Sequence, residues 1–206
     1  VEGQRQGRGK MTYKDGAIYE GDFRADQREG RGVFRAPDGY SYDGQWLAGQ
    51  MSGTGRLSYA DGSVYEGAFK ADQPEGRGKI TYRDGANYEG EWKAGTIAGS
   101  GRATYKDGAT YEGQFADEKA HGKGLLIRPD GYRYEGEWQA GKRTGKCNAS
   151  YPDGTVYEGA FVDGLRQGQG VITTPDGFSY SGQWQAGEMT GLGVATYPGG
   201  DRYEGN

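Results

Sequence analysis

The sequence predicts an all-β fold: an elongated, single-layer antiparallel sheet of stacked 23-residue β-hairpins with a right-handed twist. First, a tyrosine returns every 23 residues from Tyr19 to Tyr203 without one insertion, and a fixed period of this size marks a repeat architecture. Second, 42 of the 206 residues are glycine and the mean hydropathy is -0.95, which disfavours helices and a thick aliphatic core. Third, 13% of the residues are aromatic, and a disordered glycine-rich chain would lack them.

The repeat over residues 88–110 shows the predicted elements in order. Over 88–92, Tyr, Gly and Trp alternate with two carboxylates, and this period of two is typical of a strand. After a short connection, 99–105 is the second predicted strand. Asp107-Gly108 follows, and this dipeptide between two extended runs favours a hairpin turn because glycine accepts a positive φ. Each repeat is therefore predicted to be two antiparallel strands of about five residues.

Aromatic rings and glycines share one face of the predicted strands. A glycine stands two residues after each tyrosine, as Gly21 follows Tyr19, and Phe and Trp alternate at the fourth position after tyrosine. Because glycine leaves space for a neighbouring ring, we expect the rings to lie over glycine backbone and to replace an aliphatic core. The predicted structural aromatic face consists of Tyr19, Phe23, Tyr42, Trp46, Tyr65, Phe69, Tyr88, Trp92, Tyr111, Phe115, Tyr134, Trp138, Tyr157, Phe161 and Tyr203.

The predicted array fills the chain as a single domain over residues 1–206. A partial repeat over 1–18, eight full repeats over 19–202 and a partial repeat over 203–206 make about nine repeats. Because the phase at Val1 corresponds to the middle of a repeat, we expect the sequence to be a fragment of a longer array.

The charge of the chain limits its possible partners, and its cysteine content indicates its compartment. The 25 basic and 29 acidic residues are intermixed, with a net charge of -4, whereas nucleic-acid binding needs a concentrated positive face. We therefore predict no nucleic-acid partner. Cys147 is the single cysteine, so an internal disulfide is ruled out, which fits a reducing compartment such as the cytoplasm.

The residues that could carry chemistry are few. His121, the single histidine, occupies a position filled by Glu29 and Ser52 in other repeats, which favours a surface residue over a catalytic one. His121 and Cys147 lie in successive repeats and could share a zinc ion with carboxylates or with a second chain, although two ligands do not make a site. The Asp-Gly carboxylates are turn residues by position. We predict no catalytic residue, no metal site, no cofactor and no enzymatic activity.

The recurring pattern resembles the MORN (membrane occupation and recognition nexus) repeat. Tyr-x-Gly-x-Trp/Phe, then Gly-x-Gly, then Asp-Gly recur at one phase, for example over 65–69, 76–78 and 84–85, and Cys147 replaces the second glycine of one Gly-x-Gly pair. The chain is most similar to the standalone MORN-repeat cytoskeletal scaffolds of protozoan parasites. The resemblance implies hairpins stacked into an extended sheet, a cytoplasmic, cytoskeleton-associated location and other cytoskeletal proteins as partners.

We predict a non-enzymatic scaffold that self-associates, as a homodimer or a higher oligomer with the homodimer favoured, and organises protein partners at a cytoskeletal or membrane-associated structure. Exposed strand edges and apolar patches favour such contacts. The C-terminal repeats are the predicted dimer contact because they are unusually apolar. The residues expected there are Phe178, Tyr180, Trp184, Met189, Leu192 and Tyr197.

The alternative function is a phosphoinositide-binding membrane adaptor, which the family name implies. The densest basic stretch, over residues 24–35, is interrupted by Asp26 and Glu29, so we expect at most weak binding to anionic phospholipid. Salt-sensitive flotation with anionic liposomes would distinguish this alternative from a protein scaffold.

Overall fold

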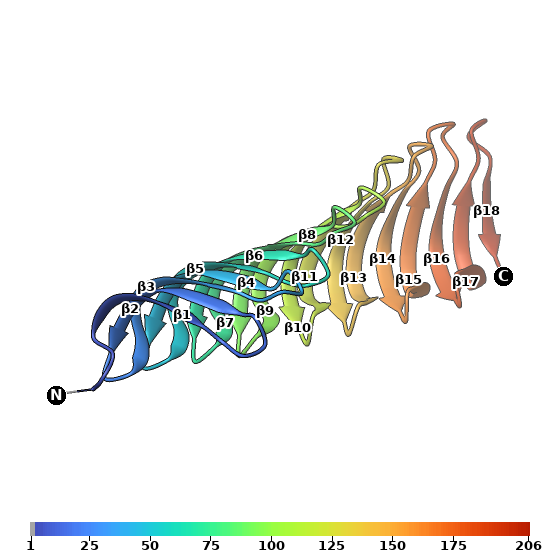
Figure 1. The fold of residues 1–206 in the computed structure, drawn as a ribbon. Helices are drawn as coiled ribbons and strands as arrows, with labels where there is room; N and C mark the ends of the chain where they lie inside the picture. The colour runs from blue at the N-terminus through green and yellow to red at the C-terminus, as the bar shows by residue number, and fades with distance from the viewer. Residues whose placement is uncertain (1–2) are drawn as a thin grey trace. The chain divides into compact units, whose positions relative to one another are not determined.

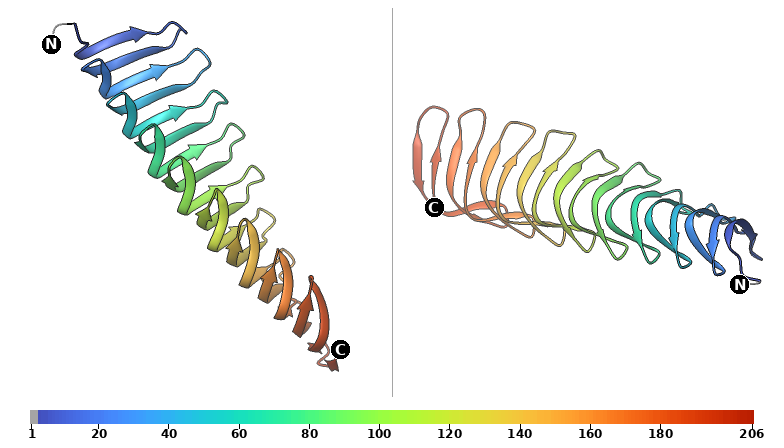
Figure 2. Two further views of the ribbon diagram at one scale, coloured as in Figure 1. Left: turned by 90° about the horizontal axis from the view of Figure 1, so that it is seen from below. Right: turned by 90° about the vertical axis from the view of Figure 1, so that its left-hand side faces the viewer.

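The protein is all-β and forms an open antiparallel sheet of hairpins, which confirms the predicted fold class. The structure, a computed structural model, describes residues 3–206 and contains 18 strands. The chain divides into two compact units, Val1–Lys106 (unit 1) and Asp107–Asn206 (unit 2). Figures 1 and 2 show that consecutive strands lie side by side within each unit.

Each unit holds nine strands, and within a unit every strand pairs antiparallel with the next one in the chain. The strands of unit 1 are β1 (Gly7–Thr12), β2 (Ile18–Arg24), β3 (Gln27–Arg35), β4 (Ser41–Leu47), β5 (Gln50–Ser58), β6 (Val64–Lys70), β7 (Gln73–Thr81), β8 (Asn87–Lys93) and β9 (Thr96–Thr104). The strands of unit 2 are β10 (Thr110–Ala116), β11 (Lys119–Ile127), β12 (Arg133–Gln139), β13 (Lys142–Ser150), β14 (Val156–Val162), β15 (Leu165–Thr173), β16 (Ser179–Gln185), β17 (Glu188–Thr196) and β18 (Arg202–Gly205).

The strands are longer than the five or so residues predicted from the sequence. Strands of seven and nine residues alternate through most of the chain, as in β8 and β9. The tight turn between β8 and β9 consists of Ala94 and Gly95, with φ of 47° and 81°. Positive φ at both central residues gives the turn twist that suits a two-residue hairpin. The sequence placed the hairpin signal at Asp-Gly instead, and the structure shows a wider loop there. In that loop Asp84 accepts a hydrogen bond from the Ala86 N–H (3.1 Å).

The two glycines of each Gly-x-Gly pair have different structural roles, a distinction that the sequence pattern did not reveal. The first glycine has a positive φ, for example 73° at Gly76 and 66° at Gly99. These glycines lie next to the places where the strand register shifts, as it does between Gly90 and Trp92. Glycine is favoured there because side chains rarely adopt this backbone conformation. The second glycine packs against a tyrosine ring, as described below.

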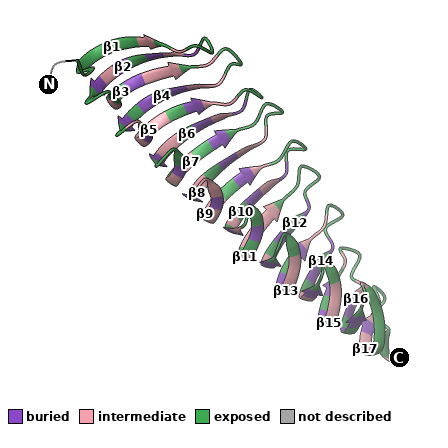
Figure 3. Ribbon diagram, turned by 60° about the horizontal axis from the view of Figure 1, so that its bottom comes forward, coloured by how far each residue is buried: buried purple, intermediate pink, exposed green. Residues whose placement is uncertain are grey.

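Burial follows the predicted alternation along the strands (Figure 3). In β4 the side chains of Tyr42 and Trp46 are buried, whereas Asp43, Gln45 and Leu47 are exposed. The tyrosines of the 23-residue series form the buried layer. Most of these tyrosines have less than 2% of their surface exposed and are the largest fully buried side chains of the described chain. Tyr203 is the exception, with 52% of its surface exposed. We call the buried side the aromatic face and the opposite side the outer face. No helix in the described part of the chain is long and apolar enough to cross a membrane.

Candidate interaction surface on the outer face

The aromatic face is a continuous series of edge-to-face ring contacts within each unit. Tyr65 contacts Phe69 of its own strand and Trp92 two strands away, with both ring centroids 5.0 Å apart and interplanar angles of 87° and 80°. Such geometry adds to the free energy of burial. The Tyr65 hydroxyl donates to the Ala68 carbonyl (2.9 Å), and Trp92 Nε1 donates to the Gly78 carbonyl (3.2 Å). The rings of this face therefore find their aromatic neighbours, and the polar atoms their hydrogen-bond partners, within the chain.

Glycine provides the space in which each ring lies. A Cβ added to Gly67 would lie 2.5 Å from the Tyr65 hydroxyl oxygen, and one added to Gly78 would lie 2.5 Å from Tyr65 Cε2. Both distances are shorter than real Cβ contacts, so a side chain at either glycine would displace the ring. We call the second glycine of each Gly-x-Gly pair a ring-seat glycine. The ring-seat glycines are Gly32, Gly55, Gly78, Gly101, Gly124, Gly170 and Gly193.

Alkaline pH is expected to unfold the protein through these tyrosines. Burial raises the pKa of Tyr42 and of Tyr65 to about 12, from 10.0 for an exposed tyrosine. Because the folded-state pKa lies above the unfolded-state pKa, stability should be constant below pH 10 and should fall as the pH rises towards 12. Tyrosinate absorbance and far-ultraviolet circular dichroism should therefore change together. Full tyrosine ionisation in a protein with intact β-structure would contradict this prediction.

The residues predicted for the dimer contact lie on different surfaces. Tyr180 and Trp184 are 8% and 2% exposed and belong to the aromatic face, where Trp184 Nε1 donates to the Gly170 carbonyl (3.1 Å). Tyr197 contacts Phe178 along the loop edge of the sheet, with ring centroids 5.7 Å apart. Two further predicted residues are exposed: Met189 pairs with Trp184 on the aromatic side, and Leu192, 67% exposed, lies on the outer face. Of the six, Leu192 is the residue that projects from the outer face.

Cys147 and His121 lie on opposite faces of the sheet. Cys147 pairs with Gly136 and is buried on the aromatic face, where a ring-seat glycine would otherwise stand. His121 is exposed and pairs with Gln114, whose side chain is on the outer face. One metal ion therefore cannot be bound by both residues of the same chain. Burial also raises the pKa of the Cys147 thiol to about 11, so the thiolate that metals and electrophiles require is disfavoured.

Charges of opposite sign alternate along the outer face of unit 1. Directly paired residues of neighbouring strands form a row across the sheet, and such cross-strand pairs of opposite charge stabilise it. Arg56 contacts Glu66 and Lys10 contacts Glu20, each at 3.1 Å. The row consists of Lys10, Glu20, Val33, Asp43, Arg56, Glu66, Lys79, Glu89 and Arg102.

The equivalent row of unit 2 contains no basic residue. It consists of Glu112, Leu125, Glu135, Asn148, Glu158, Val171, Ser181, Val194 and Glu204. Of the 25 basic and 29 acidic residues of the chain, 16 and 15 lie in unit 1, and 9 and 14 lie in unit 2. The two units therefore present outer faces of different chemistry, although they share one repeat pattern.

Aliphatic side chains replace charged ones on the outer face of β14, β15 and β17. Val162 is 52% exposed at the repeat position that Lys70 and Lys93 occupy in unit 1. It pairs with Leu165, which is 51% exposed. We define the aliphatic patch as Val162, Leu165, Val171, Leu192 and Val194. Exposed aliphatic groups that replace charges in otherwise equivalent repeats are typical of a contact surface.

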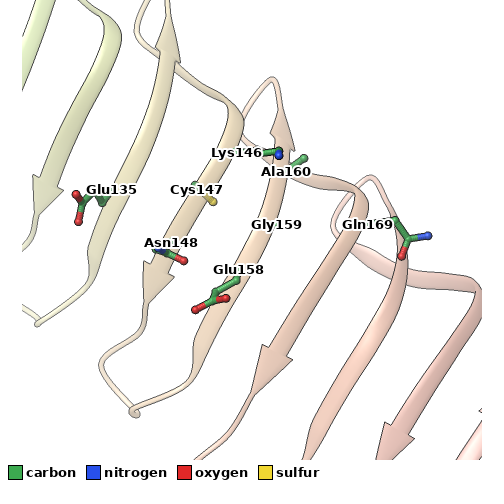
Figure 4. A pocket seen from close by; sticks show the side chains of 8 residues that line it. All are labelled: Glu135, Lys146, Cys147, Asn148, Glu158, Gly159, Ala160 and Gln169. Carbon is green, nitrogen blue, oxygen red and sulfur yellow. The ribbon is translucent and has the colours of Figure 1, made fainter.

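A shallow, open depression lies beside the aliphatic patch on the outer face. Glu135, Asn148 and Glu158 line it from the neighbouring strands β12, β13 and β14 (Figure 4). The lining also includes Lys146, Cys147, Gly159, Ala160 and Gln169. In the described part of the chain, no group of three or more His, Cys, Asp or Glu side chains is arranged to hold a metal ion. The depression is consistent with a face that contacts another macromolecule rather than one that encloses a small ligand.

The aliphatic patch could not be predicted from the overall hydrophobicity of the C-terminal repeats, because that quantity combines residues of both faces of the sheet. The signal that could have found it is a comparison of equivalent positions, where Leu165 and Leu192 replace residues such as Lys142 and Arg77 in other repeats. Assigning those positions to one face additionally requires the strand register, which only the structure gives.

The MORN repeat matches the chain nine times. The matched residues are 1–18, 19–39, 42–64, 65–86, 88–110, 111–131, 134–156, 157–179 and 180–202. None of the curated proteins shows significant sequence similarity to the chain.

Several solved structures are similar to the chain at low sequence identity. The TCP domain of SAS-4 (dCPAP), solved in complex with a proline-rich motif of Ana2 (dSTIL) of Drosophila melanogaster, is 11% identical, with a TM-score of 0.47. That alignment covers 75% of this chain and 84% of that one. The TCP10 domain of Danio rerio CPAP, solved with a peptide of Danio rerio STIL, is 14% identical, with a TM-score of 0.31 and coverages of 97% and 93%. At these scores the similarity does not inform the function of the chain.

Proposed function

The chain belongs to the MORN repeat family, and we propose that it is a non-enzymatic structural scaffold that forms a homodimer and organises protein partners. We further propose that it acts in the cytoplasm at a cytoskeletal or membrane-associated structure. The aliphatic patch of unit 2 is the proposed dimer contact.

The observation that carries this proposal is the loss of charge from the outer face of β14–β17. Val162, Leu165 and Leu192 are more than half exposed, and each occupies a position where other repeats carry a basic residue. An exposed aliphatic side chain gains free energy when it is buried, at about 25 cal/mol per Å² of apolar surface. Nothing in the register or packing of these strands requires aliphatic residues there, because charged residues fit the same positions elsewhere in the chain.

A second copy suits this surface because the surface is nearly uncharged. Glu158 and Glu188 carry the charges on the outer face of β14–β17, and the remaining outer-face side chains are aliphatic or neutral polar. When two copies meet face to face through a two-fold axis, the same patch lies on both sides of the contact. Few like charges then oppose one another, and two sheets can pack at about 10 Å with their side chains interdigitated.

Restoring the charges of the other repeats is expected to abolish the dimer. The patch-charged variant combines Val162→Lys, Leu165→Lys and Leu192→Arg, which are the residue types found at equivalent positions of folded repeats. Buried like charges should weaken dimerisation by at least about tenfold while leaving the circular dichroism spectrum unchanged. Size-exclusion chromatography with light scattering measures the mass. Leu47→Lys is the matched control, because Leu47 is 59% exposed in unit 1 at the position equivalent to Val162. A monomeric wild-type protein, or a patch-charged variant that dimerises normally, would refute the proposed contact.

The alternative function, binding of anionic phospholipid, has less support. Arg28 lies over the Trp46 ring at 4.0 Å and donates to the Gly49 carbonyl (2.6 Å). Arg143 likewise lies over the Phe161 ring at 5.1 Å. Basic residues that are engaged in this way, or that pair with carboxylates on the outer face of unit 1, do not form the concentrated positive surface that phosphoinositides require.

A further inference from the structure

Two lysines lie beside the carboxylates on the outer face of unit 2. We call Glu112, Glu135 and Glu158 the acidic row, because they stand at one register position of β10, β12 and β14. Lys123 in β11 and Lys146 in β13 each stand two residues before the member of the same register row in their own strand. Side chains two residues apart in a strand share a face. The lysines therefore form a second line on the outer face, one position nearer to the tight turns.

Neither lysine is paired within its own chain. In unit 1 the basic residue Arg56 contacts a glutamate of the neighbouring strand at 3.1 Å. Lys123 and Lys146 are exposed, and in the described chain no carboxylate forms an ion pair with either of them. Glu137 lies on the strand between them, but its carboxylate leans over Gly145, where an added Cβ would lie 2.6 Å from the carboxyl carbon. Both ammonium groups can therefore reach carboxylates of another molecule.

Shallow depressions separate the lysines from the acidic row. One is lined by Glu135 and Glu158 on one side and by Lys146 on the other, and Figure 4 shows these side chains. The adjoining depression has Glu112 and Glu135 on one side and Lys123 on the other. Glycines line both depressions between the two sides, so no side chain fills them from the same chain. Each depression thus offers two carboxylates to a basic side chain that enters from solvent.

A second copy of the chain supplies such side chains when it is related by a two-fold axis across the strands, parallel to the acidic row. Rotation about this axis, with the outer faces in contact, exchanges the two sides of the depressions. The lysines of each copy then lie over the acidic row of the other. Lys146 enters the depression between Glu135 and Glu158 of the second copy, and Lys123 enters the one between Glu112 and Glu135.

The aliphatic patch fits the same axis. Leu192 stands between two glycines of β17, at the position that the lysines occupy in β11 and β13, whereas Val171 and Val194 continue the register row of the acidic residues. The same rotation therefore places Leu192 over the valines of the second copy. Stable interfaces bury about 800 Å² on each partner, and this axis extends the contact from the patch to β10–β13. An axis along the strands would instead carry the lysines of each copy away from the acidic row of the other.

We propose that the homodimer is a face-to-face pair of sheets in which Lys123 and Lys146 of each copy bind the acidic row of the other. This inference rests on the proposed function, in which unit 2 forms a homodimer, and adds the orientation of the copies and the residues that fix it. Because the contact combines exposed charges with an aliphatic centre, added salt should weaken the dimer without abolishing it.

Two charge-reversed variants test this orientation without touching the aliphatic patch. The lysine-reversed variant carries Lys123→Glu and Lys146→Glu, and the acid-reversed variant carries Glu135→Lys and Glu158→Lys. These side chains are exposed, so circular dichroism and thermal unfolding should match the wild type. Each variant places like charges opposite one another in the dimer, so sedimentation velocity should show at least about tenfold weaker dimerisation.

The matched control reverses basic residues at the same repeat position in unit 1. Arg31 and Arg77 are exposed and each stands between two glycines, as Lys123 and Lys146 do. The Arg31→Glu, Arg77→Glu protein changes the net charge by the same amount as the lysine-reversed variant. Its dimerisation should equal that of the wild type, because the orientation places only unit 2 in the contact.

The exchange variant, which combines all four substitutions of the two reversed variants, gives the sharpest result. Two Lys→Glu and two Glu→Lys changes leave the net charge at -4. The acidic side and the basic side of the depressions are interchanged, so opposite charges meet again and dimerisation should return to within about threefold of the wild type. An equimolar mixture of the two reversed variants should likewise form a heterodimer.

The outcomes separate this orientation from the homodimer itself. Reversed variants that dimerise like the wild type, a unit 1 control that is weakened equally, or an exchange variant that stays monomeric would each overturn the orientation. If the patch-charged variant is monomeric while the reversed variants dimerise normally, the homodimer through the aliphatic patch stands and the lysine contact is wrong. A monomeric wild-type protein would overturn both.

Discussion

Replacing Gly78 with alanine is expected to destabilise the protein by about 3 kcal/mol or more, the upper end of the range for overpacked cores. The new Cβ would lie 2.5 Å from Tyr65 Cε2, and Tyr65 is itself buried between Phe69 and Trp92. The ring cannot move aside without displacing both neighbours, because packed interiors have little free volume. Denaturant unfolding followed by tryptophan fluorescence and circular dichroism measures the loss.

Gly9→Ala is the matched control for that substitution. Gly9 occupies the same repeat position on β1, but an added Cβ there would meet Phe23 atoms at 3.4 Å or more. The change in stability at low protein concentration should therefore be within about 0.5 kcal/mol, as for surface substitutions. Equal destabilisation by both substitutions would mean that glycine is needed for backbone reasons and not for the ring.

Tyr65→Ala is expected to cost about 3–5 kcal/mol, the range for loss of a buried aromatic side chain. The Tyr65 ring is fully buried and makes edge-to-face contacts with two aromatic neighbours. Each repeat packs mainly on its neighbours, so the loss should lower the cooperativity of unfolding as well as its midpoint. Chemical denaturation with fluorescence and circular dichroism as separate probes would detect both effects.

Two companion variants separate the ring from its hydroxyl. Tyr65→Phe keeps the ring but removes the hydrogen bond to the Ala68 carbonyl (2.9 Å), so we expect a cost of about 1 kcal/mol. Tyr203→Ala removes a ring of the same series that is half exposed, and its cost should be below about 1 kcal/mol. A small effect of Tyr65→Ala would show that the aromatic face does not hold the sheet together.

The outer face shows why equivalent repeats can differ in function. The aromatic face has nearly the same residues in every repeat, because each ring must fit the glycines and rings of its neighbours. The outer face has no such constraint, so its side chains can vary without loss of the fold. Val162 and Leu165 in unit 2 and the charged row around Arg56 in unit 1 are two results of that freedom. Functional contacts are therefore expected on the outer face.

The fold class follows from the sequence alone, as do the repeat length and the composition of the buried layer. A period of 23 residues, alternation of ring and carboxylate, and glycine two residues after each tyrosine are local features, and strand geometry converts them directly into hairpins. The C-terminal repeats are also unusually apolar in sequence, which directs attention to the strands that hold Leu165 and Leu192. The sequence does not assign those two residues to a surface.

Which side chains face solvent together depends on how the strands pair in the tertiary structure. Trp184 is apolar and was predicted at an interface, but its indole is buried against its own repeats. Cys147 and His121 lie in successive repeats but on opposite faces of the sheet. The physical reason is register: cross-strand neighbours are set by pairings that shift at every glycine bulge. A change of one residue in register exchanges the two faces of a strand, so rows such as that of Glu112, Glu135 and Glu158 exist only once the strands are paired.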